Sequence, residues 1–182
     1  VEDPLAVGWR DEEVQRLRFE AVTSIANLDQ AEVLDLGCGA GALKLFIDAH
    51  FQEVRYTGVE IIPELFEAAG KQIGHLPNTR LLLTDFAHWT LPEVDVVFAC
   101  GALSYRSSDP TYLARMLENM YRASRVGVAI TLMRNSVHRK DYLQAYQPEE
   151  VLPVAKRIAD HVEVAEDYLM DDFALFLHHA KG

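Results

Sequence analysis

The sequence is poor in cysteine and has no long apolar run, and each shortage excludes a class of protein. Its two cysteines, Cys38 and Cys100, stand in apolar surroundings, outside any CxxC or Cys/His ligand spacing. We therefore expect buried, reduced thiols in a cytoplasmic protein, with neither a disulfide framework nor a metal site. No stretch approaches the roughly 20 apolar residues of a membrane-spanning helix. Residues 1–8 lack the basic and apolar regions of a signal peptide.

The sequence also has little basic charge. Its 17 lysines and arginines face 28 acidic residues, which gives a formal net charge of −11. A domain with this charge repels a phosphate backbone at long range, so we do not expect a nucleic acid partner. The composition, 49% hydrophobic and 25% charged, is otherwise typical of a globular protein, and 182 residues suit a single domain.

Apolar residues recur alternately at helical steps and in short runs typical of strands. The predicted helices are 11–28, 43–50, 63–73, 109–123 and 148–158, and the predicted strands are 32–36, 54–60, 79–83, 94–100, 127–133, 162–168 and 172–179. Five strand–helix repeats predict parallel strands joined by right-handed crossovers. Only about three residues separate the last two strands. That is too short for a crossover, so these two strands should form an antiparallel hairpin.

These elements predict the α/β fold class. We expect a single doubly wound, mostly parallel seven-stranded sheet with a C-terminal antiparallel hairpin and helices on both faces. Residues 1–30 would form an N-terminal flap and a helix packed on the core, and residues 31–182 would form the main domain. Ligands of such sheets bind outside the carboxyl ends of the strands. Polar residues at those ends are therefore the candidates for a binding site.

A glycine-rich segment, Gly37-Cys38-Gly39-Ala40-Gly41, follows the first predicted strand directly. Glycines at a strand-to-helix turn allow positive φ and let the backbone approach a ligand closely. The N–H groups at the start of the next helix favour an anionic group. The segment also fits the dinucleotide fingerprint loosely, and a turn that only packs a helix on a strand stays open.

Carboxylates end three successive strands. Asp35 stands two residues before the first glycine, where it is awkward beside a pyrophosphate and suits an ammonium or sulfonium group. Glu60 closes the second strand and can accept hydrogen bonds from both hydroxyls of a ribose. Asp85 follows the third strand and can accept from the exocyclic amine of adenine. Ile61 and Phe86 flank these acids and could enclose a flat base.

Four short segments follow one another along the predicted sheet, namely 33–41, 58–60, 84–86 and 95–103. In this order and at this spacing they resemble the motifs of the class I S-adenosylmethionine-dependent methyltransferase family. The resemblance covers essentially the whole chain from Val33 onward. It implies S-adenosylmethionine as cofactor and S-adenosylhomocysteine as product, and it leaves the methyl acceptor open.

The resemblance also implies which residues contact the cofactor. The glycine turn would hold the methionine part, Glu60 the ribose and Asp85 the adenine, while backbone at the end of the fourth strand would contact the methionine amine. The full set of candidates is Asp35, Gly37, Cys38, Gly39, Gly41, Glu60, Ile61, Asp85, Phe86, Cys100, Gly101, Trp9 and Arg18. Structural alternatives remain open. Asp35 could orient the glycine turn, Asp85 could be a turn residue, and both thiols could belong to the core.

The segment before the first helix offers a possible cover for the site. Trp9 precedes that helix and Arg18 lies within it. The leading helix of this fold often runs near the open end of the sheet, so we hypothesise that Trp9 and Arg18 help to close the site. Arg18 could pair with a carboxylate there. The alternative is a capping tryptophan and a solvated arginine.

Three polar residues are candidates for the acceptor side. Tyr105 follows the fourth strand, and His138 and Tyr142 follow the fifth. A general base is needed only when the acceptor is weakly acidic or protonated, so none of the three is assigned a catalytic role. No Asn/Asp-Pro-Pro-aromatic motif follows the fourth strand, which argues against planar amine acceptors such as adenine, cytosine or glutamine. No metal-ligand set is evident.

We therefore expect an S-adenosylmethionine-dependent methyltransferase that acts on a small molecule or metabolite. One alternative is an NAD-type oxidoreductase, against which the position of Asp35 argues. The other alternative is a non-catalytic scaffold that has kept the cofactor fold. The sequence leaves the acceptor atom and the oligomeric state open.

Overall fold

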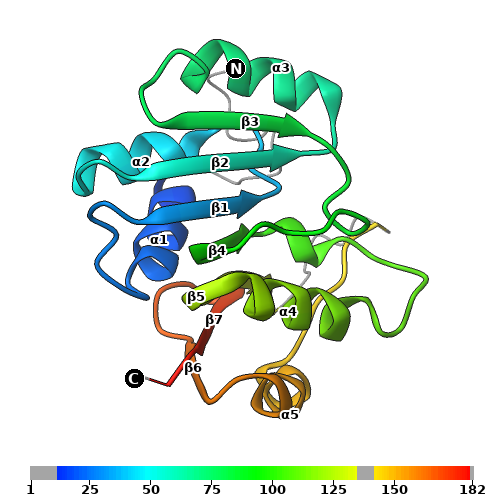
Figure 1. Cartoon of the computed structure of the whole chain (residues 1–182). Helices are drawn as coiled ribbons and strands as arrows, with labels where there is room; N and C mark the ends of the chain where they lie inside the picture. The colour runs from blue at the N-terminus through cyan, green and yellow to red at the C-terminus, as the bar shows by residue number, and fades with distance from the viewer. Residues whose placement is uncertain (1–11, 135–141, 181–182) are drawn as a thin grey trace.

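The computed structural model describes residues 12–134 and 142–180 of the chain. Seven strands form one sheet in the order β3-β2-β1-β4-β5-β7-β6 (Figure 1). The strands are β1 (Glu32–Leu36), β2 (Arg55–Glu60), β3 (Thr79–Leu83), β4 (Val94–Cys100), β5 (Ser124–Met133), β6 (His161–Ala165) and β7 (Asp172–His178). β1 to β5 pair in parallel, whereas β7 pairs antiparallel with both β5 and β6. The predicted fold class is confirmed.

Helices cover both faces of the sheet. They are α1 (Glu12–Thr23), α2 (Ala42–His50), α3 (Pro63–Ile73), α4 (Tyr112–Ala123) and α5 (Pro148–Ile158), with a short 3₁₀ turn, η2 (Ala102–Ser104), after β4. Figure 1 shows α4 and α5 in front of the sheet and α1 and α2 behind it. Buried residues of α1, α2 and α3 belong to one hydrophobic core, and those of α4 and α5 to another.

The central strand β4 separates these two cores. Val96 and Phe98 point into the core beneath α1, α2 and α3, whereas Val97 and Ala99 point into the core beneath α4 and α5. All four side chains are at most 1% exposed. A strand buried on both faces is largely apolar, and in the sequence the apolar run 96–100 after Asp95 identified it.

Several element boundaries differ from the predicted ones. α1 ends at Thr23, not at residue 28, and the Thr23 hydroxyl donates to the Phe19 carbonyl at 2.7 Å. α4 begins at Tyr112, because Asp109 accepts the Thr111 N–H at 2.8 Å and forms a turn there. β5 begins at 124 and β6 ends at 165, so residues 166–171 connect β6 to β7. The predicted hairpin is nevertheless confirmed, with a longer connection than expected.

Gly127 marks a close approach between β5 and β7. A Cβ at this position would stand 2.4 Å from the Leu177 carbonyl oxygen and 3.1 Å from Ile25. The first atom belongs to the backbone of the neighbouring strand and cannot move aside cheaply. A side chain here would therefore push apart the pair that joins the antiparallel strand to the parallel part of the sheet.

We expect Gly127→Ala to lower the free energy of unfolding by roughly 1–3 kcal/mol, because the core would be overpacked at this point. Urea denaturation measures the effect. Gly70→Ala is the matched control, because a Cβ at Gly70 would meet no atom within 4 Å. In the middle of α3 that change should be neutral or stabilising by about 0.5–1 kcal/mol. Equal effects of the two changes would contradict the close-approach interpretation.

Candidate functional site

The glycine turn lies at the carboxyl edge of the sheet, directly after β1. The N–H groups of Gly37 and Cys38 both donate to the Val59 carbonyl, at 2.8 and 3.0 Å, and this fixes the turn against β2. Positive φ values occur at Gly37 (75°), Gly39 (56°) and Gly41 (90°). A Cβ at Gly37 would stand 2.4 Å from the Ala102 Cβ, so the turn also touches the segment that follows β4. Glycine is required there on both counts.

The Glu60 carboxylate, not that of Asp35, holds this turn in place. Its Oε2 accepts the Gly39 N–H at 2.9 Å, and its Oε1 accepts the N–H groups of Ile61 and Ile62 at 2.8 and 2.9 Å. Glu60 is only 4% exposed. A buried carboxylate needs such donors, and three backbone N–H groups supply them. Oε1 accepts two of these groups and Oε2 only one, so Oε2 keeps acceptor capacity for a ligand hydroxyl.

Asp35 points into the interior and is 2% exposed. The Tyr56 hydroxyl donates to its Oδ2 at 2.6 Å. Burial raises the pKa of Asp35 to about 7; the Tyr56 hydrogen bond opposes this rise, and the nearby Glu60 charge adds to it. The carboxylate that was expected to face the ligand or the turn is therefore bonded to a tyrosine of the neighbouring strand, and a ligand contact by Asp35 stays a prediction.

Asp85 lies in the turn after β3 and bonds locally. Its Oδ1 accepts the Ala87 N–H at 2.9 Å, and His88 Nδ1 lies 2.7 Å from its Oδ2. The hydrogen bond with His88 holds the pKa of Asp85 below its usual range. Phe86 is buried and lies beside the position of a Gly37 Cβ, at 3.9 Å. Ile61, by contrast, is 50% exposed and offers an open apolar surface.

Both cysteines are buried free thiols. Burial raises the pKa of Cys100 to about 12 and places that of Cys38 further above its ordinary value. The Thr131 hydroxyl donates to Cys100 Sγ at 3.7 Å. Gly101 follows with a φ of 79°, which turns the chain away from β4 at the same edge as the glycine turn. The thiols are therefore protonated at neutral pH, and ligand contacts by Cys38, Cys100 and Gly101 stay predictions.

Arg18 forms an ion pair with Asp172, at the start of β7. Asp172 is 2% exposed, and burial raises its pKa to about 6 while Arg18 opposes the rise. The Tyr168 hydroxyl is buried nearby, and its interaction with the Asp172 carboxylate also opposes the rise in the pKa of Asp172. Arg18 thus ties α1 to the carboxyl edge through a carboxylate of the protein itself. Sequence reasoning missed Asp172, because its partner is 154 residues away.

Two of the three acceptor-side candidates meet at this edge. The rings of Tyr105 and Tyr142 stack with centroids 6.2 Å apart and planes 15° apart. The Arg106 N–H donates to the Tyr142 carbonyl at 2.8 Å, which holds the segment after 141 beside the exit of β4. Both tyrosines are about half exposed. His138 and Trp9 lie outside the described residues.

In residues 12–134 and 142–180, no group of three or more His, Cys, Asp or Glu residues is placed to hold a metal ion. None of the described helices is long and apolar enough to cross a membrane.

The chain was then compared with known proteins. Residues 33–127 match the family model described as a methyltransferase domain. This is more than half of the chain and includes the glycine turn, Glu60 and Asp85. The chain belongs to the methyltransferase domain family. The predicted resemblance to class I S-adenosylmethionine-dependent methyltransferases is thereby confirmed, and the family match decides against the NAD-type alternative.

Individual relatives agree with this assignment. A Mycobacterium tuberculosis protein named as a methyltransferase, Rv1506c, is 27% identical over 84% of this chain and 96% of its own length. Trans-aconitate 2-methyltransferase of Klebsiella pneumoniae is 26% identical over 60% of this chain, which spans only 43% of that enzyme. A structure titled as a SAM-dependent methyltransferase from Aquifex aeolicus has the same fold, with a TM-score of 0.74 at 18% identity, and the match covers 99% of this chain and 100% of that one.

The carboxyl edge of this methyltransferase brings most of the predicted residues together. The glycine turn, Glu60, Asp85 and the backbone at 100–101 all follow strands that end at this edge. The sequence analysis did not identify Tyr56, Tyr168 or Asp172. They carry no motif, and only the pairing of distant strands places them beside predicted residues.

The buried Asp35 predicts a specific pH dependence of stability. An unfolded aspartate has a pKa of about 3.9, whereas that of Asp35 is about 7 in the folded state. Between these values the folded protein keeps a proton that the unfolded chain has lost. Relative to Asp35→Asn, the free energy of unfolding should therefore fall by roughly 1–4 kcal/mol as the pH rises from about 4 to about 7. Urea titrations at several pH values measure this difference, and a pH-independent difference would contradict it.

Proposed function

We propose that this methyltransferase transfers a methyl group from S-adenosylmethionine to an oxygen, nitrogen or carbon atom of a small molecule. The observation that carries the proposal is the arrangement at the carboxyl edge. There a positive-φ glycine turn and a buried carboxylate accepting three backbone N–H groups meet the end of β4. Trans-aconitate and (S)-coclaurine methyltransferases among the relatives support a small-molecule acceptor.

The edge fits the cofactor in its charges and its shape. The turn from Gly37 to Gly41 carries no side chain at three of its five positions, so its backbone could approach the methionine part closely. Glu60 has acceptor capacity for the ribose hydroxyls. Ile61 offers an exposed apolar surface for the adenine, with Asp85 as acceptor for its amine. Leu83, 50% exposed at the end of β3, is a further apolar candidate that the sequence analysis did not identify.

The residues of the chain would bind and orient, while the bound cofactor supplies the electrophilic methyl group. Transfer of this kind depends strongly on holding the nucleophile in line with the methyl, so positioning is the main task of the protein. The stacked pair of Tyr105 and Tyr142 stands where an acceptor could be positioned. A base is required only if the acceptor enters with its proton, and His138 stays a candidate for that role.

The remaining expectations are proposals of the same kind. The division into residues 1–30 and 31–182 stays a prediction, with α1 packed on the sheet through the pair of Arg18 and Asp172. The buried free thiols Cys38 and Cys100 favour a reducing, cytoplasmic location. The net charge of −11 argues against a nucleic acid substrate.

Calorimetry with two ligands tests the cofactor. We expect S-adenosylhomocysteine to bind and NAD to show no heat of binding at the same concentrations. Incubation with methyl-labelled S-adenosylmethionine and a panel of carboxylic acids, amines and phenols then tests the acceptor class. Binding of NAD without S-adenosylhomocysteine would overturn the proposal. Cofactor binding without turnover on any acceptor class would favour the non-catalytic scaffold.

Glu60→Ala should weaken S-adenosylhomocysteine binding by about 1.5–3 kcal/mol, because it removes a charged acceptor of the ribose hydroxyls. Titration calorimetry measures the change. Glu64→Ala, at an exposed position in the first turn of α3, is the control and should leave the affinity unchanged. Circular dichroism checks that both variants remain folded.

Loss of the Gly39 contact could also loosen the turn in Glu60→Ala. A second ligand separates the two effects. If Glu60 binds the ribose, the penalty of the substitution should shrink for an analogue of S-adenosylhomocysteine that lacks the 2′-hydroxyl, as in a double-mutant cycle. An equal penalty for both ligands would assign Glu60 to the turn alone.

A further inference from the structure

One face of the sheet is covered over only part of its width. The connection from β3 to β4, residues 84–93, contains no helix. α4 and α5 lie in front of the β4–β5 side of the sheet, and Figure 1 shows no described helix in front of β3, β2 and β1. Leu82 on β3 and Trp89 in the connection are only partly buried on this face. A sheet face in an α/β protein is ordinarily covered by helices, so this one lacks its usual cover.

A groove of about 490 Å³ opens here, at the amino ends of the first four strands. Thr57, Leu82 and Trp89 line it, together with charged residues from each of the four strand starts. Its charged residues lie at the opposite edge of the sheet from the glycine turn and Glu60, while Leu82 and Trp89 extend the groove toward the carboxyl edge. The charged residues are therefore separate from the candidate cofactor site.

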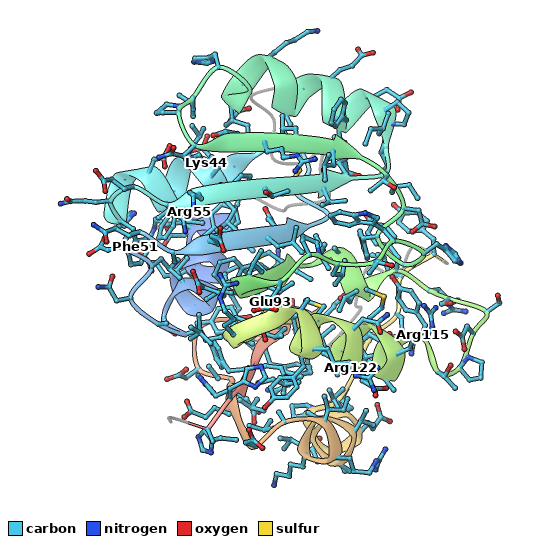
Figure 2. The ribbon with its side chains drawn as sticks, viewed as in Figure 1. Lys44, Phe51, Arg55, Glu93, Arg115 and Arg122 are labelled. Carbon is cyan, nitrogen blue, oxygen red and sulfur yellow. The ribbon has the colours of Figure 1, made fainter. Side chains whose placement is uncertain are left out.

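The charges along the groove follow the order of the strands. Arg80 on β3 and Arg55 on β2 stand at one end, and Glu32 on β1 and Glu93 just before β4 stand at the other. Strand register places Glu32, Arg55 and Arg80 on one face, because Glu32 pairs with Arg55 and Arg80 pairs with Thr57. Glu93 lines the same groove from the segment just before β4. Figure 2 shows Arg55 and Glu93 at the amino ends of β2 and β4. The row reads positive, positive, negative, negative.

Ion pairs within the chain do not cancel the charges of this row of four residues. Among the described residues Arg80 forms no ion pair, and Glu93 is 70% exposed. Arg55 lies 3.3 Å from Glu32, an exposed pair of little energetic weight. Arg125 contacts Glu32, Glu93 and Asp95, but one guanidinium shared among three carboxylates leaves this end negative. The positive end at Arg80 has no such counterpart.

We propose that this groove is the interface of a homodimer, in which the row of charges on one copy runs opposite to that on the other. A twofold axis sets the same patch against itself, so the patch must be self-complementary. A row that is positive at one end and negative at the other meets that requirement when reversed. Arg80 would face Glu93 of the partner subunit, and Trp89 with Leu82 would add apolar contact area beside the row of charges.

The dimer would leave the carboxyl edge open, since the charged residues of the groove and the candidate cofactor site lie at opposite ends of the strands. Variants in the groove should therefore keep their affinity for S-adenosylhomocysteine. The two proposals can therefore fail independently. If the wild type did not bind S-adenosylhomocysteine, the proposed function would be contradicted and the dimer proposal would not be affected.

Analytical ultracentrifugation of the full chain tests the proposal. The wild type should sediment as a species of twice the 20.5 kDa chain mass. Arg80→Glu and Glu93→Arg should each weaken dimerisation by more than about a hundredfold, because like charges would meet across the axis. Arg122→Glu is the control, since this α4 residue is 72% exposed and lies outside the groove (Figure 2); it should remain dimeric.

Mixing the two single variants provides the decisive measurement. In a mixed pair, position 80 of either copy meets the opposite charge at position 93 of the other. We therefore expect Arg80→Glu and Glu93→Arg to be monomeric alone and dimeric when mixed, and the double variant Arg80→Glu/Glu93→Arg to dimerise by itself. A monomeric wild type, dimers that persist in both single variants, or a mixture that stays monomeric would each overturn the proposal.

Discussion

The carboxylate of Glu60 joins the parts of the carboxyl edge. It accepts one N–H from the glycine turn after β1 and two from the start of the connection after β2. A turn with several positive-φ glycines exposes N–H groups that no regular ladder satisfies. A buried carboxylate, in turn, requires donors. The carboxylate supplies acceptors for these N–H groups, and the N–H groups supply its donors. The connections after β1 and β2 therefore have a fixed relative position. The geometry of the candidate site depends on this arrangement.

Asp35 is a second buried carboxylate, on the adjacent strand β1, and its hydrogen-bond donors differ from those of Glu60. Among the described residues its one hydrogen-bond donor is the Tyr56 hydroxyl, and burial raises the pKa of Asp35 to about 7. The difference from Glu60 lies in the surroundings. Glu60 ends its strand beside free backbone N–H groups, whereas Asp35 stands one residue inside its strand, where the backbone groups are engaged in the sheet. The same residue type therefore serves the turn at one position and the interior at the other.

The sheet uses its two edges differently. At the carboxyl edge, connections from β1, β2, β3 and β4 gather around the glycine turn. At the amino edge, the ten-residue connection between β3 and β4 is too short for a covering helix, and a charged groove remains on that face. A short crossover thus leaves the interior of the fold intact and changes its surface. Binding of cofactor and contact between copies can then occupy opposite ends of the same strands without interference.

The sequence by itself determined the fold and the place of the candidate site. Apolar runs such as 96–100 identify buried strands, and glycines with acids at strand ends indicate the edge where a ligand is expected. Helix ends at Thr23 and Tyr112 were misjudged, because side-chain hydrogen bonds in a single turn decide them. Only the tertiary structure decided that Asp35 faces Tyr56, that Glu60 holds the turn and that Arg18 pairs with Asp172. These contacts join residues from 21 to 154 positions apart. Local periodicity carries no information about them, because strand order and register bring the partners together.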